Sequence, residues 1–266
     1  MKIKSKILII AGSDSSGGAG IQADIKTVTA LGSYAMTAVT AVTAQNTRGV
    51  KKITSIPTKN VHKQITMILD DIGANAVKIG MLHNVGIIKC VYSILKKYKL
   101  KNVVLDPVMV TKGGTKLISN SSIKYLKKLL LPMSNLVTPN IPEAETLTGY
   151  SILNKEDMIK AAKKILNMGS KNVLLKGGHL KSKMICDILA TKKGIKVFSK
   201  RKIKTKNTHG TGCTLSSALA TCLSQKKNIV KSCKISLRYV DKAITSAPGY
   251  GKGFGPLNHL VSFNLR

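Results

Sequence analysis

Short apolar runs alternate with helical patterns along most of this chain. Ile7 to Ala11 is an apolar run typical of a buried strand, and residues 21–31 then carry apolar side chains at helical spacing. The same alternation predicts further strands over 34–44, 76–81, 103–109, 136–139 and 173–175, and further helices over 61–72, 85–95, 123–131 and 158–168. Repeated units of this kind favour an α/β fold of three layers, in which helices cover both faces of a mostly parallel sheet.

The last third of the chain departs from this alternation. Residues 184–190 and 195–203 predict an antiparallel pair of strands, joined by a turn at 192–194. Two more helices are expected, one from about residue 211 and one over about 229–246. The sequence shows no internal repeat and no linker, so we predict one domain over residues 1–266.

The chain is strongly basic, but its charge is dispersed. Among the 266 residues, 44 Lys and Arg face 11 Asp and Glu, which gives a net charge of +33. Only four of the basic residues are Arg, the lysines lie on nearly every segment, and aromatic residues make up 4% of the chain, with no Trp. Nucleic-acid surfaces instead cluster Arg and aromatic side chains. We therefore expect solvated lysine-rich faces and no specific nucleic-acid partner.

The sequence gives no support for a membrane-spanning protein, a secreted protein or a zinc site. The apolar run near the N-terminus is far shorter than the roughly 18 residues that a spanning helix needs, and a Gly-rich segment follows it. The five cysteines form no C-x-x-C pair, and an odd number argues against a disulfide framework. We expect a cytoplasmic protein without membrane contact.

A Gly-rich segment, residues 11–20, separates the first predicted strand from the first helix. Its glycines do not fit the dinucleotide fingerprint, but Gly17 and Gly18 permit a close approach of ligand to backbone. Asp24, one turn into the helix, is a candidate for a hydrogen bond to a ligand hydroxyl. An ordinary acidic first turn explains it equally well.

The segment 207–214 is the best candidate for handling phosphate. Backbone N–H groups of Gly210, Thr211 and Gly212 are expected at the start of a helix, where the dipole and the unpaired donors favour an anion. Cys213 at the same helix end is expected to have a thiol pKa lowered from about 8.5 towards neutrality, which would supply a base or nucleophile. The alternative is a small buried filler. His209 and the other histidines are not paired at ligand spacing, and we interpret them as polar or core residues.

Two acidic residues follow predicted strands in a chain that has few of them. Asp106 ends the apolar run at 103–105, and Glu143 follows the strand at 136–139. Carboxylates at the C-terminal edge of a parallel sheet suit a hard cation such as Mg²⁺. For Glu143, stabilisation of a first helical turn is an alternative. Lys176 ends another strand and is a candidate for a nucleotide phosphate.

Taken together, these segments resemble the ribokinase-like superfamily, and within it the hydroxymethylpyrimidine/phosphomethylpyrimidine kinases of thiamine biosynthesis. The blocks that carry the resemblance are 11–24, 44–50, 78–81, 105–109, 138–144, 176–179 and 207–216. The resemblance implies a ribokinase-like fold and ATP-dependent phosphorylation, with Mg²⁺, of 4-amino-5-hydroxymethyl-2-methylpyrimidine and then of its monophosphate. It also implies a homodimer.

The resemblance assigns roles to individual residues. It implies a substrate pocket in which the Gln45 amide pairs with the aminopyrimidine edge, completed by Gly12, Asp24, Met81 and Val108. It implies that Cys213 takes the hydroxymethyl proton while the amides of 210–212 stabilise the transferred phosphoryl group. The remaining assignments are nucleotide binding by Asn140, Lys176 and Thr208, and metal binding by Asp106 and Glu143.

Two rival functions remain open. A pyridoxal or pyridoxine kinase also phosphorylates a hydroxymethyl group on an aromatic nitrogen ring, although Gln45 and the block after it favour the pyrimidine. A basic polyanion-binding protein on a degenerate kinase fold is the rival from another class.

Overall fold

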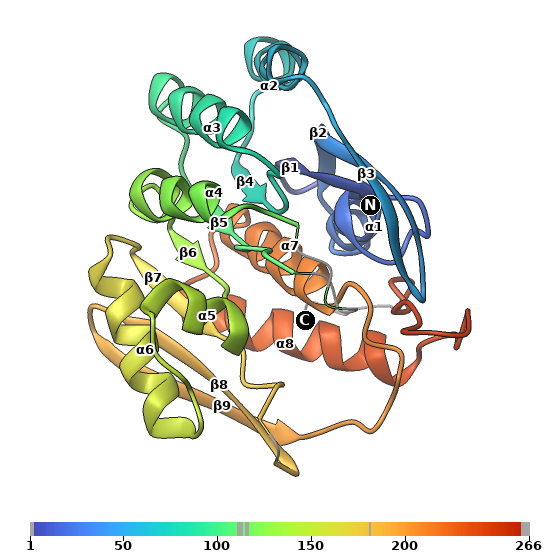
Figure 1. Ribbon diagram of the computed structural model, residues 1–266, viewed down its shortest axis with the longest axis vertical. Helices are drawn as coiled ribbons and strands as arrows, with labels where there is room; N and C mark the ends of the chain where they lie inside the picture. The colour runs from blue at the N-terminus through green and yellow to red at the C-terminus, as the bar shows by residue number, and fades with distance from the viewer. Residues whose placement is uncertain (1–2, 111–113, 115–116, 181, 262–266) are drawn as a thin grey trace.

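The computed structural model describes residues 3–110, 114, 117–180 and 182–261. Within these residues nine strands form a sheet in the order β3-β2-β1-β4-β5-β6-β7-β8-β9. The strands from β2 to β7 in this order run parallel, whereas β3, β8 and β9 pair antiparallel with their neighbours. Helices cover both faces of the sheet (Figure 1), so the predicted three-layer α/β/α architecture with a mostly parallel sheet is confirmed.

The strands are short in the centre and long at the N-terminal side. They are β1 (Lys6–Asp14), β2 (Tyr34–Asn46), β3 (Gly49–Ser55), β4 (Ala76–Ile79), β5 (Val103–Leu105), β6 (Leu136–Val137), β7 (Asn172–Leu175), β8 (Met184–Thr191) and β9 (Gly194–Arg201). Because β1 has a neighbouring strand on either side and helices over both faces, its side chains alternate between two apolar layers. Leu8 and Ile10 join one hydrophobic cluster, while Ile7 and Ile9 join the other.

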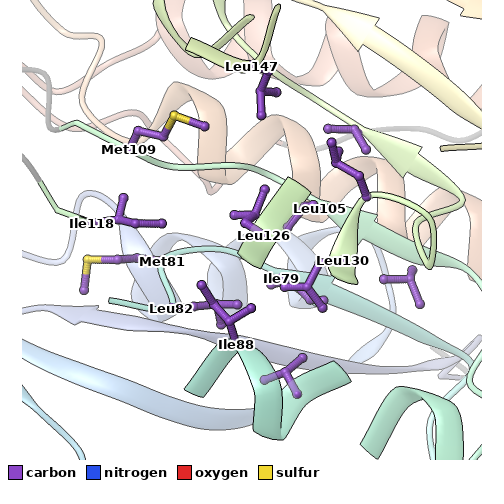
Figure 2. Packing of buried hydrophobic residues seen from close by; sticks show 14 of the residues in the cluster. Ile79, Met81, Leu82, Ile88, Leu105, Met109, Ile118, Leu126, Leu130 and Leu147 are labelled. Carbon is purple, nitrogen blue, oxygen red and sulfur yellow. The ribbon is translucent and has the colours of Figure 1, made fainter. Parts of the chain in front are cut away.

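The helices divide between these two layers. They are α1 (Gly20–Ala30), α2 (Thr58–Asp71), α3 (Val85–Lys97), α4 (Asn120–Tyr125), the π-helical turn η1 (Leu126–Leu130), α5 (Ile141–Thr148), α6 (Lys155–Asn167), α7 (Thr211–Ser224) and α8 (Ile229–Thr245). The larger cluster packs α2 to α6 against the sheet; Figure 2 shows part of it, with Ile79 and Leu105 next to Leu126 and Leu130. The smaller cluster holds α1, α7 and α8 on the opposite face.

Three segments differ from the sequence prediction. Residues 49–55 form β3, an antiparallel edge strand that the alternation did not indicate, because most of its side chains are exposed or half-buried. Residues 141–148 form α5, which a Pro in the first turn and a Gly after the last residue delimit. The run expected as a strand over 103–109 leaves the sheet after Leu105, before Asp106.

Among the described residues, no helix combines the length and apolarity needed to cross a membrane. The late antiparallel pair, β8 and β9, agrees with the sequence prediction. Asn154 caps the start of α6. Asn154 accepts a hydrogen bond from the Asp157 N–H at 2.9 Å.

Candidate active site

The C-terminal ends of the parallel strands and the start of α7 lie next to one another. Gly210, directly before α7, has a φ of +79° that favours glycine. A Cβ on Gly210 would overlap the carbonyl oxygen of Gly18, so the Gly-rich loop after β1 and the start of α7 touch along their backbones. Asp14 and His209 are thereby brought together, and residues 207–213 stand beside the ends of β1, β5 and β7.

Asp14 organises the Gly-rich loop. Its carboxylate accepts hydrogen bonds from the Ser16 N–H at 2.9 Å, the Ser16 hydroxyl at 2.7 Å and the Ala19 N–H at 2.8 Å. It also lies 2.7 Å from His209 Nε2. Burial alone would raise the pKa of Asp14, but the hydrogen bonds from His209 and Ser16 outweigh burial and lower that pKa to about 2. Asp14 is therefore ionised at neutral pH.

Gln45 lies at the end of β2, in contact with this loop. Its backbone N–H donates to the Ser15 hydroxyl at 2.9 Å. Its side-chain amide lies 3.1 Å from Thr43 Oγ1 and 3.3 Å from His209 Nε2. Gln45 is half-buried, so its amide is held by neighbours and still accessible to a ligand.

Asp24 does not face a ligand site, contrary to expectation. Its side chain has no exposed surface, and its oxygens bind Lys78 Nζ at 2.7 Å and the Ser217 hydroxyl at 2.7 Å. Burial disfavours the ammonium of Lys78, but the Asp24 carboxylate outweighs this and raises the pKa of Lys78. Asp24 therefore joins α1 to β4 and α7 through a buried ion pair, because both of its oxygens are engaged.

Cys213 lies in the first turn of α7, as expected, but its predicted pKa is wrong. Burial raises the pKa of the thiol to about 12; the Lys78 charge opposes this rise, and the carboxylates of Asp24 and Asp106 add to it. The helix-end argument neglected burial and two nearby negative charges, which outweigh the helix dipole. The thiol is therefore protonated at neutral pH in the absence of ligands.

Asp106 and Lys176 form an ion pair beside the first turn of α7. Asp106 Oδ1 lies 3.0 Å from Lys176 Nζ and accepts from the Thr138 hydroxyl at 3.0 Å. A Cβ on Gly212 would lie 3.3 Å from both Asp106 Oδ2 and Lys176 Nζ. The phosphate candidates 210–212 and the candidate metal ligand Asp106 are thus in one place.

Glu143 and Asn140 form a capping box at the start of α5. Asn140 Oδ1 accepts from the Glu143 N–H at 2.9 Å, and Glu143 Oε2 accepts from the Asn140 N–H at 2.8 Å. Burial raises the pKa of Glu143 to about 7, with Lys176 opposing and Asp106 adding to the rise. The helix-stabilising alternative for Glu143 is therefore realised, and its carboxylate still senses the charges of Asp106 and Lys176.

Two smaller features complete the candidate site. The Thr208 hydroxyl is buried, and within the described part of the chain it has no hydrogen-bond partner. An unpaired buried hydroxyl is unfavourable, which suits a group that a ligand completes. Gly12 lies against the Met81 side chain, where a Cβ would collide with the methyl group. Val108 is half-buried just after Asp106.

The sequence reasoning missed three residues of this region: His209, Asp14 and Lys78. His209 was interpreted as a polar or core residue because no second ligand lies near it in the sequence. Its partner Asp14 is 195 positions away, so local spacing carried no signal. Lys78 was hidden among forty lysines, although it lies within the buried strand β4.

A family model described as phosphomethylpyrimidine kinase matches residues 14–258 of this chain. The chain is 43% identical over 257 residues to the hydroxymethylpyrimidine/phosphomethylpyrimidine kinase of Bacillus subtilis. This alignment covers 96% of this chain and 95% of that protein. It is 47% identical over 259 residues to a thiamine biosynthesis bifunctional protein of Geobacter sulfurreducens, covering 97% of this chain and 53% of that protein. The chain thus spans about half the length of the bifunctional relative.

The fold also matches a solved pyridoxal kinase. The ADP complex of the Bacillus subtilis enzyme superposes with a TM-score of 0.89 at 36% identity, covering 96% of this chain and 97% of that one.

Proposed function

Because this chain belongs to the phosphomethylpyrimidine kinase family, we propose that it uses ATP to phosphorylate 4-amino-5-hydroxymethyl-2-methylpyrimidine and then the resulting monophosphate. The proposal rests on the contact between the Gln45 amide and His209 Nε2. This contact places the Gln45 side chain next to the start of α7. An amide offers a donor and an acceptor side by side, as does the edge of an aminopyrimidine. The phosphate-binding candidates 210–212 directly follow His209.

The first turn of α7 would stabilise the transferred phosphoryl group. The backbone N–H groups of Gly210, Thr211 and Gly212 lie at a helix N-terminus, where the dipole favours negative charge. Charge grows on the phosphoryl oxygens during transfer, so donors fixed in advance accelerate the step. Gly212 contributes by its size, because a larger residue would press on Asp106 and Lys176.

Cys213 would accept the proton of the hydroxymethyl group. At rest its pKa of about 12 leaves little thiolate at neutral pH. Asp106 is one of the charges that raise this pKa, so neutralising Asp106 lowers it. We propose that binding of the nucleotide with its cation provides this neutralisation, which couples formation of the base to binding of the nucleotide.

Mg²⁺ would be held by Asp106 and Glu143. Carboxylate oxygens are the ligands that Mg²⁺ prefers, and it commonly takes one or two of them together with water and nucleotide phosphates. The residues fit this pattern: both carboxylates are buried, they influence each other electrostatically, and no group of three or more His, Cys, Asp or Glu side chains gathers among the described residues. Bound there, Mg²⁺ would neutralise charge on the transferred phosphoryl group.

Lys176, Asn140 and Thr208 would contact the nucleotide. Lys176 carries a half-buried ammonium whose partner, Asp106, is the proposed cation ligand, so the ammonium would exchange Asp106 for a phosphate when the cation binds. The unpaired Thr208 hydroxyl would gain a partner at the same time.

A homodimer is proposed from the family resemblance, and sedimentation equilibrium tests it. A cytoplasmic location is proposed because ATP is supplied there, and cell fractionation tests it. No specific nucleic acid and no membrane lipid is proposed as a partner.

The deciding experiment measures ADP release from the purified protein with Mg-ATP and one of four acceptor conditions: the hydroxymethylpyrimidine, its monophosphate, pyridoxal, or no acceptor. Turnover with the first two and not with pyridoxal is the expected result. No turnover with any acceptor would contradict the proposal.

Pyridoxal phosphorylation is the second candidate, favoured by the close structural match to a pyridoxal kinase. Equal turnover with pyridoxal would support it. The higher identity to the pyrimidine kinase of the same organism, 43% against 36%, argues for the first candidate.

A further inference from the structure

The partners of the Gln45 amide determine which of its ends is the donor. In the structure the Gln45 oxygen lies 3.1 Å from Thr43 Oγ1, and its nitrogen lies 3.3 Å from His209 Nε2. The two ends of an amide have nearly the same shape, so the hydrogen-bond network decides between them.

On the His209 side, the network requires an acceptor. Asp14 Oδ2 lies 2.7 Å from His209 Nε2, and an ionised carboxylate can only accept. His209 Nε2 therefore carries a hydrogen, whether the ring is neutral or charged. A Gln45 nitrogen facing the same Nε2 places donor against donor.

On the Thr43 side, the network requires a donor. The Thr43 hydroxyl has one hydrogen to donate. Thr43 Oγ1 lies 2.9 Å from the Ser13 carbonyl oxygen, which can only accept, so this hydrogen points to Ser13. With that hydrogen committed, Thr43 Oγ1 accepts from whichever Gln45 atom faces it. A half turn of the Gln45 amide satisfies both sides at once.

We propose that Asp14 and His209 are positioning residues that hold the Gln45 amide with its oxygen towards His209 and its NH₂ group towards Thr43, and thereby select an acceptor ring that carries an amine beside an unprotonated ring nitrogen. This inference rests on the proposed function. His209 is itself held in place, because its backbone N–H donates to the Gly255 carbonyl at 3.0 Å and its ring covers Gly18, where a Cβ would collide with it.

This orientation of the Gln45 amide also determines how the pyrimidine ring of the substrate is oriented. The amine donates to the Gln45 oxygen, so it lies on the His209 side, and the ring nitrogen accepts from the Gln45 NH₂ group on the Thr43 side. In 4-amino-5-hydroxymethyl-2-methylpyrimidine the amine and the hydroxymethyl group sit on adjacent carbons. The hydroxymethyl group is therefore on the His209 side, towards residues 210–212 and Cys213. The opposite polarity would turn it away from them.

The test compares the amine substrate with its 4-oxo analogue, which has oxygen in place of the amine and a hydrogen on the neighbouring ring nitrogen. Wild-type protein is expected to prefer the amine by roughly 10²-fold or more in kcat/KM, because the analogue reverses both hydrogen bonds. In His209→Ala the amide can turn, so this preference should shrink by roughly tenfold or more, with the loss for the amine substrate mainly in KM. His209→Gln, which keeps a donor for Asp14, should retain most of it, and His62→Ala, an exposed histidine on α2, should retain all of it.

An unchanged preference in folded His209→Ala overturns the inference. Nitrogen NMR of histidine-labelled wild-type protein gives a second measurement that does not depend on the variant's folding, with His209→Gln used only to assign the signal. A protonated His209 Nε2 is expected, and an unprotonated Nε2 overturns the inference. If wild-type protein phosphorylates neither compound, the proposed function fails, while the NMR result still decides the orientation of the amide.

Discussion

Cys213 has surroundings that oppose the chemistry proposed for it. Burial and two nearby carboxylates raise the pKa of its thiol, while Lys78 and the start of α7 favour the thiolate. The balance shifts when a nearby negative charge is neutralised, and Asp106 is the one that a cation would reach. On the proposed mechanism, Cys213 would become reactive only after the nucleotide and its cation have bound.

Cys213→Ala is expected to lower kcat by roughly 10² or more, the scale of losing a positioned base, while nucleotide affinity stays within about twofold. Steady-state kinetics and nucleotide titration by calorimetry measure the two quantities. Cys90→Ala, on α3 in the opposite helix layer, is the matched control and should leave both unchanged.

The pH profile separates a base from a packing residue in this experiment. If Cys213 is the base, wild-type kcat/KM should rise with pH between 7 and 9, because the thiolate fraction of the free enzyme grows tenfold per unit below its pKa. The residual activity of Cys213→Ala should lack this rise. Wild-type turnover in the variant would remove Cys213 from the mechanism.

The sequence predicted residues whose role depends on local position, and missed those whose role depends on distant partners. Gly210, Gly212 and Cys213 lie at a helix start, where spacing alone placed them. Asp24 and His209 owe their roles to Lys78 and Asp14, which local patterns cannot identify. The roles of Gln45, Met81 and Val108 were implied by resemblance and stay predictions.

Hydrophobic alternation located most elements because most of them bury one face. The expected boundaries differ by a few residues at some helix ends, as at α2, which was expected over 61–72 and spans Thr58–Asp71. β3 was missed because this edge strand, with two consecutive exposed lysines and no buried side chain, carries little apolar signal. The π-helical turn η1 has no sequence signal that we can identify. A single domain over 1–266 stays a prediction.

The segment after α8 returns to α7 and buries a histidine there. His259 Nε2 lies 2.9 Å from Thr214 Oγ1, and the Tyr239 hydroxyl donates to the His259 carbonyl at 3.0 Å. Burial, and then the charge of Lys26, lower the pKa of His259 to about 4. The folded protein therefore keeps this ring neutral, whereas the unfolded chain protonates it below about pH 6.5.

The stabilisation that the buried neutral His259 gives the folded protein should fall in acid. Between about pH 6.5 and 4 the unfolded chain binds a proton that the folded protein does not, so the stabilisation is present above 6.5 and is lost as the pH falls. At about 1.4 kcal/mol per pKa unit, the loss approaches roughly 3 kcal/mol. Urea unfolding from pH 7 to 4 should show the stability of wild-type protein relative to His259→Gln falling by this amount.

The comparison with His259→Gln is needed because titration of Glu143 changes the free energy of unfolding with pH in the opposite direction to His259. The pKa of Glu143 is raised to about 7 in the folded protein. Its contribution to the free energy of unfolding is therefore fully present below about pH 4.5 and is lost as the pH rises through 7. Taking the difference between the two proteins cancels Glu143. A difference that does not change with pH would show that His259 titrates normally.

At the scale of the whole molecule, a net charge of +33 dominates the surface. Like charges on one compact body repel, and salt screens them within about 10 Å at 0.1 M. The melting temperature should therefore rise by several degrees between about 20 mM and 0.5 M NaCl. A double variant, Lys63→Glu with Lys160→Glu, both exposed on α2 and α6, should melt higher at low salt and respond less to NaCl. A melting temperature independent of salt would contradict this account.

The same charge explains any attraction to polyanions without a dedicated site. Binding to a DNA duplex should fall steeply with salt and show no preferred sequence, because only phosphates are contacted. Specific binding that survives physiological salt would instead revive the polyanion-binding alternative.

The two halves of the candidate site come from opposite ends of the chain. Asp14 and Asp24 belong to the first elements, and their partners His209 and Ser217 lie 195 and 193 positions later. During synthesis, β1, β2 and β4 can pair long before α7 leaves the ribosome. Until then Asp24 lacks its hydrogen bond from Ser217, and Asp14 in the Gly-rich loop lacks its contact with His209. A nascent chain of this protein can therefore pair its first strands early, yet it completes the candidate site only after α7 has been translated.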